Sequence, residues 1–228
     1  MNSFLPLLTT NTSNLSHFLY RFFPKYLKVS ALKGAVVECG VGYGRSALLL
    51  VQCAEILEDK CNFFFFDSFQ GFPELTSEDK NQPGQTSCAS KGEWNYIQPN
   101  DLAGFIAMSF GVGHNDKVAQ EALRRTFIIK GFLEDSLTDQ CIGKINAVGG
   151  IKFLHLDVDL YSAYKTCLER LYDLVVPGGV VCFDEYHPNS LKKFPGSKRA
   201  IDEFFVSRGI DPNRIMLDAI GKAYYYKI

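Results

Sequence analysis

Acidic residues end two of the apolar runs in this chain, in a pattern that can bind a divalent cation. Asp157 ends the run IKFLHLD, and Asp184 and Glu185 end the run VVCFDE. If these runs are neighbouring parallel strands, about 4.8 Å apart, the three carboxylates converge. Carboxylates about 4 Å apart repel by about 4 kcal/mol at an effective dielectric constant near 20, so one is protonated or a cation lies between them. Three hard oxygen donors suit Mg²⁺. The alternative is that these residues cap helices or turns at the edge of the sheet.

A glycine-rich turn lies earlier in the chain, in GAVVECGVGYGRS at residues 34–46. A short apolar run is followed by Glu38 and by glycine at positions 40, 42 and 44, before Arg45 and Ser46 open a helical run. Glycine lets the chain turn tightly and lets a ligand approach the backbone. The next helix offers free N–H groups and a partial positive charge. We therefore expect a nucleotide-like cofactor at the end of the first strand.

Two more carboxylates flank this turn. Asp67 ends the next apolar run, NFFFFD, 29 residues after Glu38. We expect Asp67 to accept both hydroxyls of a ribose, unless it only forms the turn before Ser68. Glu38, next to the glycines, can hold a cationic amine or an ordered water.

These residues need a sheet that brings several strand ends together. Apolar runs predict parallel strands at residues 35–37, 62–67, 126–130, 151–157 and 180–185. Helices are predicted between them and after the last, at residues 46–60, 101–111, 116–125, 162–174 and 197–208, with PGG (177–179) as a helix stop signal and Ser197 as a helix N-cap. Residues 214–218 and 223–227 predict a closing antiparallel hairpin. The order predicts an α/β fold, a doubly wound, mostly parallel seven-stranded sheet that binds ligands above the carboxyl ends of its strands.

The composition predicts one domain over residues 1–228, with an N-terminal helical segment at 1–33 that Pro24 interrupts. The net charge of −1 gives no field that would attract nucleic acid or a membrane surface. Seven scattered cysteines without a C-x-x-C pair favour reduced thiols and a cytoplasmic location. No run reaches the roughly 18 apolar residues of a membrane span, and the first residues lack the basic region of a signal peptide.

A long irregular insertion follows the second strand. Residues 68–100 are rich in Gly, Pro, Ser and charge, and we expect residues 68–112 to form a lid or insertion over the site. Its Phe72, Trp94 and Tyr96 are either a wall for the acceptor or ordinary packing.

A basic cluster follows the fifth strand. It consists of Lys192, Lys193, Lys198 and Arg199. The cluster is either a solvated face or a site that recognises an anionic acceptor.

Several motifs together resemble a known family. ECGVGYGRS (38–46) has the E-x-G-x-G-x-G form of S-adenosylmethionine-dependent methyltransferases. The chain is similar to the macrocin O-methyltransferase family over roughly residues 34–206, in FDSFQGFP (66–73), KGFLEDSL (130–137), LDVDLYSAYKTCLERLYDLVVPGG (156–179), FDEY (183–186) and FPGSKRAIDEFF (194–205). Enzymes of this family methylate sugar hydroxyls in natural-product biosynthesis. The resemblance implies a Rossmann-like class I methyltransferase that uses S-adenosylmethionine and Mg²⁺.

The resemblance also implies roles for individual residues. The methionine part of the cofactor would lie against Glu38, Gly40 and Ser46, the ribose hydroxyls against Asp67, and the adenine against Asp135 and Ser136, with Tyr43 and Ser68 as further cofactor-binding residues. Asp157, Asp184 and Glu185 would bind Mg²⁺. The family often has two Asp residues where this chain has Asp184–Glu185, so the third ligand carries a longer side chain here.

The expected reaction transfers the methyl group to an acceptor hydroxyl that Mg²⁺ holds in line with it. Asp157 can also take the proton, and His187 is the rival base unless it is a solvated loop histidine. We expect Asp159 to orient its neighbours and His155 to be a core histidine. The acceptor is a small molecule, with a sugar hydroxyl implied by the resemblance, and a homo-oligomer is possible by analogy with the family.

Two other functions fit a glycine turn after a first strand. An NAD(P)-dependent oxidoreductase would have its third glycine three residues after the second, whereas Gly44 comes two residues after Gly42. A non-catalytic S-adenosylmethionine-binding module is the second alternative, although such a module needs no metal ligands.

Overall fold

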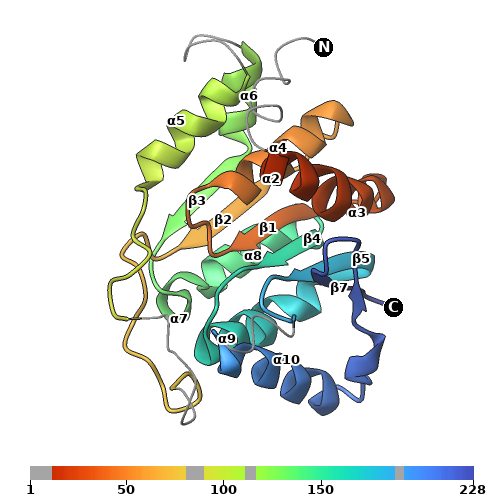
Figure 1. The fold of residues 1–228 in the computed structure, drawn as a ribbon. Coiled ribbons are helices and arrows are strands. Elements are labelled where there is room, and N and C mark those ends of the chain that lie inside the picture. Colours follow the sequence, from red (N-terminus) through yellow and green to blue (C-terminus); the bar gives the residue numbers. More distant parts are fainter. Residues whose placement is uncertain (1–11, 81–89, 111–116, 188–192) are drawn as a thin grey trace.

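A mixed sheet forms the centre of the protein in the computed structural model, which describes residues 12–80, 90–110, 117–187 and 193–228 (Figure 1). The described strands follow the spatial order β3-β2-β1-β4-β5-β7-β6. They are β1 (Ala35–Cys39), β2 (Phe63–Asp67), β3 (Thr126–Lys130), β4 (Ile151–Leu156), β5 (Val175–Phe183), β6 (Met216–Leu217) and β7 (Ala223–Tyr226). The first five are parallel, and the pairs β5–β7 and β6–β7 are antiparallel. This arrangement confirms the predicted α/β fold and its closing hairpin.

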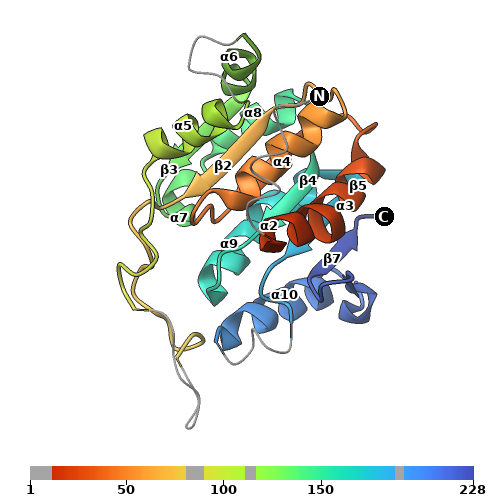
Figure 2. The same ribbon diagram turned by 45° about the horizontal axis from the view of Figure 1, so that its top comes forward.

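Helices cover both faces of the sheet, as the two views in Figures 1 and 2 show. One face is covered by α2 (Thr12–Ser16), η1 (His17–Phe22), α3 (Phe23–Val29), α4 (Arg45–Ile56), α5 (Pro99–Ser109) and α6 (Lys117–Arg124). The other is covered by α7 (Leu133–Ser136), α8 (Asp139–Ala147), α9 (Tyr161–Leu171) and α10 (Pro195–Ser207). Two short 3₁₀ turns, η2 (Tyr172–Leu174) and η4 (Pro212–Arg214), complete the connections. No helix in the described ranges is both long and apolar enough to span a bilayer.

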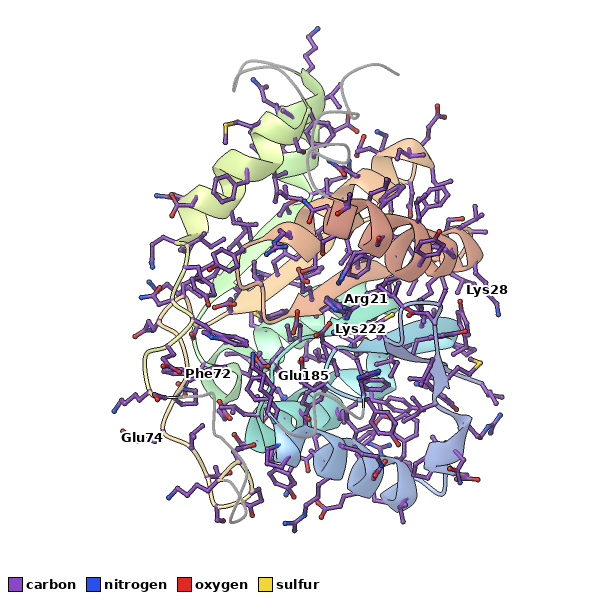
Figure 3. All side chains as sticks on the ribbon, in the orientation of Figure 1. Arg21, Lys28, Phe72, Glu74, Glu185 and Lys222 are labelled. Atoms are coloured by element: carbon purple, nitrogen blue, oxygen red, sulfur yellow. The ribbon has the colours of Figure 1, made fainter. Side chains whose placement is uncertain are left out.

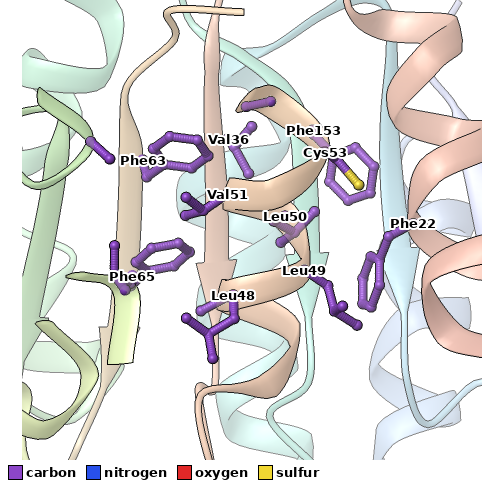
Figure 4. Close-up of a cluster of buried hydrophobic side chains, with 14 of the residues drawn as sticks. Phe22, Val36, Leu48, Leu49, Leu50, Val51, Cys53, Phe63, Phe65 and Phe153 are labelled. Atoms are coloured by element: carbon purple, nitrogen blue, oxygen red, sulfur yellow. The ribbon is translucent and has the colours of Figure 1, made fainter. Parts of the chain in front are cut away.

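The strands are apolar on both sides because each side packs under a helical layer. Val36 and Phe63 face α4 and the N-terminal helices, as Figure 4 shows, whereas Val37 and Phe64 face α7 to α10. All four side chains are at most 1% exposed. Continuous apolar runs are what a parallel sheet buried on both faces requires.

The strands β4 and β5 are neighbours, which the convergence of the acidic residues required. Leu156 lies opposite Phe183 in the register, and the amide of Asp184 donates to the carbonyl of Leu156 over 2.9 Å. Asp157 and Asp184 therefore follow the ends of adjacent strands.

The helical turns before β5 end at Leu174, as predicted, but the PGG motif lies inside the next strand. The helix α9 ends at Leu171, the η2 turn follows directly, and Pro177 lies inside β5. Between Ile151 and Phe153 the register moves from Val175 to Val180, so the extra residues, including Gly178 at φ +80°, form a bulge. Pairing with β4 thus begins at Val175, before the motif.

Ser197 does not cap a helix, which is a second correction. Pro195 occupies the first turn of α10, and the cap position is Phe194. Ser197 is buried, and its hydroxyl donates to the carbonyl of Phe194 over 2.7 Å. Proline starts this helix two residues before the serine that was expected to do so.

The N-terminal segment is helical on both sides of Pro24. Pro24 lies in the first turn of α3, where its missing N–H needs no partner. The irregularity comes before it, where η1 is a six-residue π-helix. π-Helical turns are rare and often occur at functional sites.

Candidate active site

The glycine turn after β1 passes directly over the end of β4. Gly40 has φ +82°, and a Cβ atom there would lie 1.8 Å from the carbonyl oxygen of Asp157. Gly42 has φ +54°, and a Cβ atom there would meet nothing within 4 Å. Glycine is thus required at position 40 by the crossing backbone, while position 42 borders open space that a ligand can fill.

Two cavities meet at this turn. The first has a volume of about 330 Å³ and the second about 110 Å³. Both are lined by Gly40, Gly42, Trp94, Asp157 and Asp159. The carboxyl ends of β1 and β4, where the order of a doubly wound sheet reverses, are the expected place for a ligand.

Asp67 and Ser68 line the second cavity. The Asp67 carboxylate accepts from the amides of Val41, Gly42 and Phe69, at 2.7, 3.2 and 2.7 Å. Asp67 therefore holds the glycine turn in place, and it also faces the cavity in which we expected it to bind a ribose.

The far end of the second cavity differs in detail from the predicted adenine site. It is lined by Phe132, Leu133 and Glu134, whereas Asp135 is exposed and lies outside the lining. Ser136 is 6% exposed, and its hydroxyl has no hydrogen-bond partner among the described residues. Phe132 was missed because an aromatic residue after a strand carries no sequence signal that separates stacking from packing.

Glu38 is buried beneath the turn rather than exposed in a cavity. It lies opposite His155 in the β1–β4 register, and both side chains are fully buried. His155 Nε2 accepts from Nη2 of Arg21 at 2.6 Å, so His155 carries its proton on Nδ1 and donates to Glu38 Oε1 at 2.7 Å. Burial raises the pKa of Glu38 well above its ordinary value and lowers that of His155 well below. The other oxygen, Glu38 Oε2, has no partner among the described residues.

Tyr43 and Ser46 line the first cavity beside Arg45. The Tyr43 ring stacks on Tyr96 from the insertion, with ring centres 3.7 Å apart and an angle of 11° between the planes. Both rings are exposed, at 52% and 42%. The pair forms a flat aromatic surface at the rim of the cavity.

Asp184 is held by two cations that sequence reasoning did not identify. Arg21 from η1 donates from Nη1 to Asp184 Oδ1, and Lys222 donates to Oδ2 at 2.5 Å. Figure 3 shows the two cationic side chains together near the centre of the molecule, close to Glu185. Burial alone would raise the pKa of Asp184, but these two charges outweigh it and hold the pKa below the usual range.

The remaining carboxylates form a group around Asp157. Ligand atoms of Asp157, Asp159 and Glu185 all lie within 4.8 Å of one another, and a second such group joins Asp157 to Asp184 and His155. The described residues do not place Asp157, Asp184 and Glu185 in a single group. Asp157 is common to both and is the centre of the acidic cluster.

The hydrogen bonds that hold Glu185 explain why it groups with Asp157 and Asp159 and not with Asp184. Glu185 accepts from the hydroxyl of Tyr164 at 2.5 Å and from the amide of Asp159 at 3.4 Å. Asp159 is 5% exposed and adopts φ +58°, which is strained for a residue other than glycine. Glu58, Phe69 and Trp94 also have positive φ, so this conformation assigns no role by itself, and the orienting role of Asp159 stays a prediction.

The acidic cluster contains more carboxylates than cations. Burial and the charge of Asp184 raise the pKa of Asp157 to about 7. Burial and neighbouring carboxylates also raise the pKa values of Asp159 and Glu185 well above the ordinary range. Four carboxylates face two internal cations, which leaves a deficit of two positive charges when all four are ionised. This donor set fits one Mg²⁺ ion.

The remaining predicted residues are His187 and the basic cluster, and those that the structure describes line neither cavity. His187 lies beside the C-terminal turn, with its Nε2 atom 3.0 Å from where a Cβ of Gly221 would be, and it lines neither cavity. Lys193 lies over the ring of Trp94 at 4.9 Å. Lys198 and Arg199 pair with carboxylates of α10 itself. Lys192 lies outside the described residues.

Solved structures share this fold. A calicheamicin methyltransferase, CalS11, matches with a TM-score of 0.70 and 21% identity over 94% of this chain and 78% of that one. The O-methyltransferase NovP matches with a TM-score of 0.66 and 19% identity over 90% and 76%. An apo structure of CalS11, described as a TDP-rhamnose 3'-O-methyltransferase, matches with a TM-score of 0.64 and 18% identity over 94% and 79%. No curated protein matches the sequence.

The sheet order, the glycine turn and the carboxylates at the strand ends define a class I methyltransferase. The chain belongs to the macrocin O-methyltransferase family, whose model, described as Macrocin-O-methyltransferase (TylF), matches residues 24–227. It is therefore an S-adenosylmethionine-dependent O-methyltransferase, and the oxidoreductase alternative does not apply.

Proposed function

We propose that this enzyme methylates a hydroxyl of a sugar or a glycosylated small molecule, with a divalent ion held at Asp157. The observation that carries the proposal is the acidic cluster, in which Asp157 groups with Asp159 and Glu185 and also with Asp184, beside the glycine turn. Both cavities meet there, so a cofactor that spans them and an acceptor in the larger one would touch at Asp157 and Asp159.

S-adenosylmethionine would extend across the turn from one cavity to the other. Gly42 leaves room for it, and the unpartnered Oε2 of Glu38 lies beneath the turn as a possible acceptor for its amine. Tyr43 and Ser46 would border the methionine part, and Asp67 with Ser68 would border the ribose. The unpartnered hydroxyl of Ser136 would serve the adenine end, whereas Asp135 points to solvent and supports no contact.

The acidic residues would divide the remaining work. A bound Mg²⁺ would lower the pKa of the acceptor hydroxyl and fix its position. Asp157, Asp184 and Glu185 remain the proposed ligands, with Asp157 central to both groups. Asp159 lines both cavities and His187 lines neither, which supports Asp159 over His187 as the group that would accept the hydroxyl proton.

The sugar acceptor is supported by the family and by the aromatic rim. Sugars present C–H groups that pack on aromatic rings, and the stacked Tyr43–Tyr96 pair with Trp94 offers such a surface. A neighbour of the same fold, the calicheamicin enzyme, is described as acting on TDP-rhamnose, and that likeness concerns the fold alone.

The decisive experiment combines Mg²⁺ binding with methyl transfer to a panel of sugar acceptors. We expect EDTA to abolish turnover, Asp157→Asn to abolish both Mg²⁺ binding and turnover, and Asp159→Asn to lower kcat by about 100-fold or more while Mg²⁺ still binds. His187→Ala should retain activity. Full turnover with EDTA, or in the Asp157→Asn variant, would contradict a metal-assisted mechanism.

A further inference from the structure

Both oxygens of Asp184 are occupied by cations of the protein itself. Lys222 Nζ lies 2.5 Å from Oδ2 and 3.3 Å from the main-chain oxygen of the same residue. Arg21 bonds Oδ1, and its side chain is only 3% exposed. Arg21 and Lys222 are therefore built into the acidic cluster and are not mobile surface charges.

These two cations come from elements outside the core strand–helix units. Arg21 belongs to the π-helix η1, whose wider turn is one of the rare helical forms found at functional sites. Lys222 directly precedes β7. A second link, at 2.8 Å, joins Lys25 of α3 to Asp218, which directly follows β6, and does not involve Asp184.

We propose that Arg21 and Lys222 act as internal counter-ions that limit the affinity of the acidic cluster for Mg²⁺. This inference rests on the proposed function, because it assumes that the cluster binds the ion. With both cations present the four carboxylates lack two positive charges, and without one of them they lack three. Removing either cation therefore strengthens Mg²⁺ binding, although it removes two or more hydrogen bonds from the site.

The expected change in Mg²⁺ affinity on removing one cation follows from Coulomb's law. At about 6 Å, repulsion between a single and a double positive charge changes affinity about tenfold even at the dielectric constant of bulk water. A partly buried site has a lower effective dielectric constant, so tenfold is the lower end of the expected range.

The test is calorimetric titration of the whole protein with Mg²⁺ alone. We expect Lys222→Met and Arg21→Gln each to lower the Kd for Mg²⁺ by about tenfold or more. Asp184→Asn should raise the Kd for Mg²⁺, because it removes a negatively charged carboxylate. Structural damage to a metal site weakens binding, so tighter binding distinguishes a counter-ion from a merely structural residue.

Two control variants isolate the charge. Lys222→Arg keeps the positive charge and should bind Mg²⁺ like the unchanged protein. Lys25→Met breaks the neighbouring link to Asp218 and a bond to the Arg21 carbonyl but removes no cation from the Asp184 carboxylate, so it should change the Kd much less than Lys222→Met, while thermal melting confirms that each variant is folded.

The possible outcomes separate this inference from the proposed function. Unchanged or weaker Mg²⁺ binding in folded Lys222→Met and Arg21→Gln, with binding intact in the unchanged protein, would overturn the counter-ion role alone. No binding in the unchanged protein but binding in the variants would support it, because the internal cations would then exclude the ion. No binding in any of them would overturn both the counter-ion role and the metal site.

Discussion

Gly40 is the position in the glycine turn at which an added side chain would disrupt the structure most. A Cβ atom there would lie 1.8 Å from the Asp157 carbonyl oxygen, at a φ of +82°. We expect Gly40→Ala to lower the free energy of unfolding by about 3 kcal/mol or more, since the backbone of β1 or β4 must move. Urea unfolding measures this cost directly.

Two other glycines provide matched controls for Gly40. Gly209 has φ +68° with open space around it, far from the turn, so Gly209→Ala should cost about 1 kcal/mol and leave S-adenosylhomocysteine binding unchanged. Gly42→Ala should cost a similar amount of stability but weaken that binding, because its methyl group enters the cavity. Equal stability costs at positions 40 and 209 would refute the argument from the crossing backbone.

The positions of the acidic residues were predictable, and those of their cationic partners were not. Asp157, Asp184 and Glu185 each end an apolar run, and the topology of a parallel sheet then brings them to one edge. Arg21 lies 163 positions from Asp184 in the sequence and on a π-helix, for which no periodicity pattern exists. The signal available was a charged residue inside the aromatic run HFLYRFF, where burial demands a partner.

At the scale of elements, the N-terminal helices and the C-terminal hairpin are joined by buried charge. The side chains of Lys25 and Asp218 are each 5% exposed and 2.8 Å apart. We expect Lys25→Met or Asp218→Asn alone to cost about 3 kcal/mol of unfolding free energy, because each leaves a buried group without its partner. Urea unfolding of both single variants and the double variant forms a double-mutant cycle.

The double variant should cost clearly less than the sum of the two single variants. A strictly additive result would mean that the pair is not coupled and that other contacts, such as Lys28 over the ring of Tyr226, join these elements.

The insertion after β2 is a second element with a testable role. Its two arms pair through Phe72 and Glu93, at 3.0 Å from amide to carbonyl, and Trp94 packs between Phe72 and Phe194. Trp94 is the only tryptophan of the chain and lines both cavities. We expect S-adenosylhomocysteine to change the intrinsic fluorescence of Trp94, measured by titration at a fixed protein concentration.

Variants distinguish contact with the ligand from movement of the loop. Trp94→Phe should abolish the fluorescence change while calorimetry still detects binding. Phe194→Ala, which removes one wall around Trp94, should shift the emission spectrum of the free protein. A spectrum that S-adenosylhomocysteine leaves unaltered at saturation would argue against a lid over the cofactor.

The order of elements was predictable because the core strands are short, mainly apolar runs that alternate with helical patterns. The residues at which helices and strands begin and end were less predictable, because strand pairing overrides local sequence signals. PGG lies in a bulge of β5 because Val175 already pairs with Ile151, and α10 begins at Pro195 rather than Ser197. Sequence alone also does not show whether Phe72 and Trp94 pack on each other or on an acceptor.

At the scale of the whole molecule, the burial of thiols makes the free energy of unfolding decrease at alkaline pH. Burial raises the pKa of Cys61 to about 11 and that of Cys182 to about 11. Their stabilising contribution is complete below the ordinary thiol pKa near 9 and is lost as the pH rises toward 11, because the unfolded chain releases these protons first. Each thiol should then lower the unfolding free energy by up to about 1.4 kcal/mol per pH unit.

Urea unfolding at about pH 8 and about pH 10 measures this loss. Cys182→Ala should reduce the difference between the two conditions by roughly the share of one thiol. If the variant and the unchanged protein lose the same amount, Cys182 contributes nothing, and the loss comes from Cys61 or from other groups such as tyrosines.

The pairing of Arg21 and Lys222 on one carboxylate also has a consequence for biosynthesis. The ribosome makes Arg21 early and Lys222 201 residues later, so Asp184 first meets only one of its partners. While Lys222 and β7 are still inside the ribosome, the acidic cluster of a folded nascent chain would therefore carry one positive charge less than that of the finished enzyme.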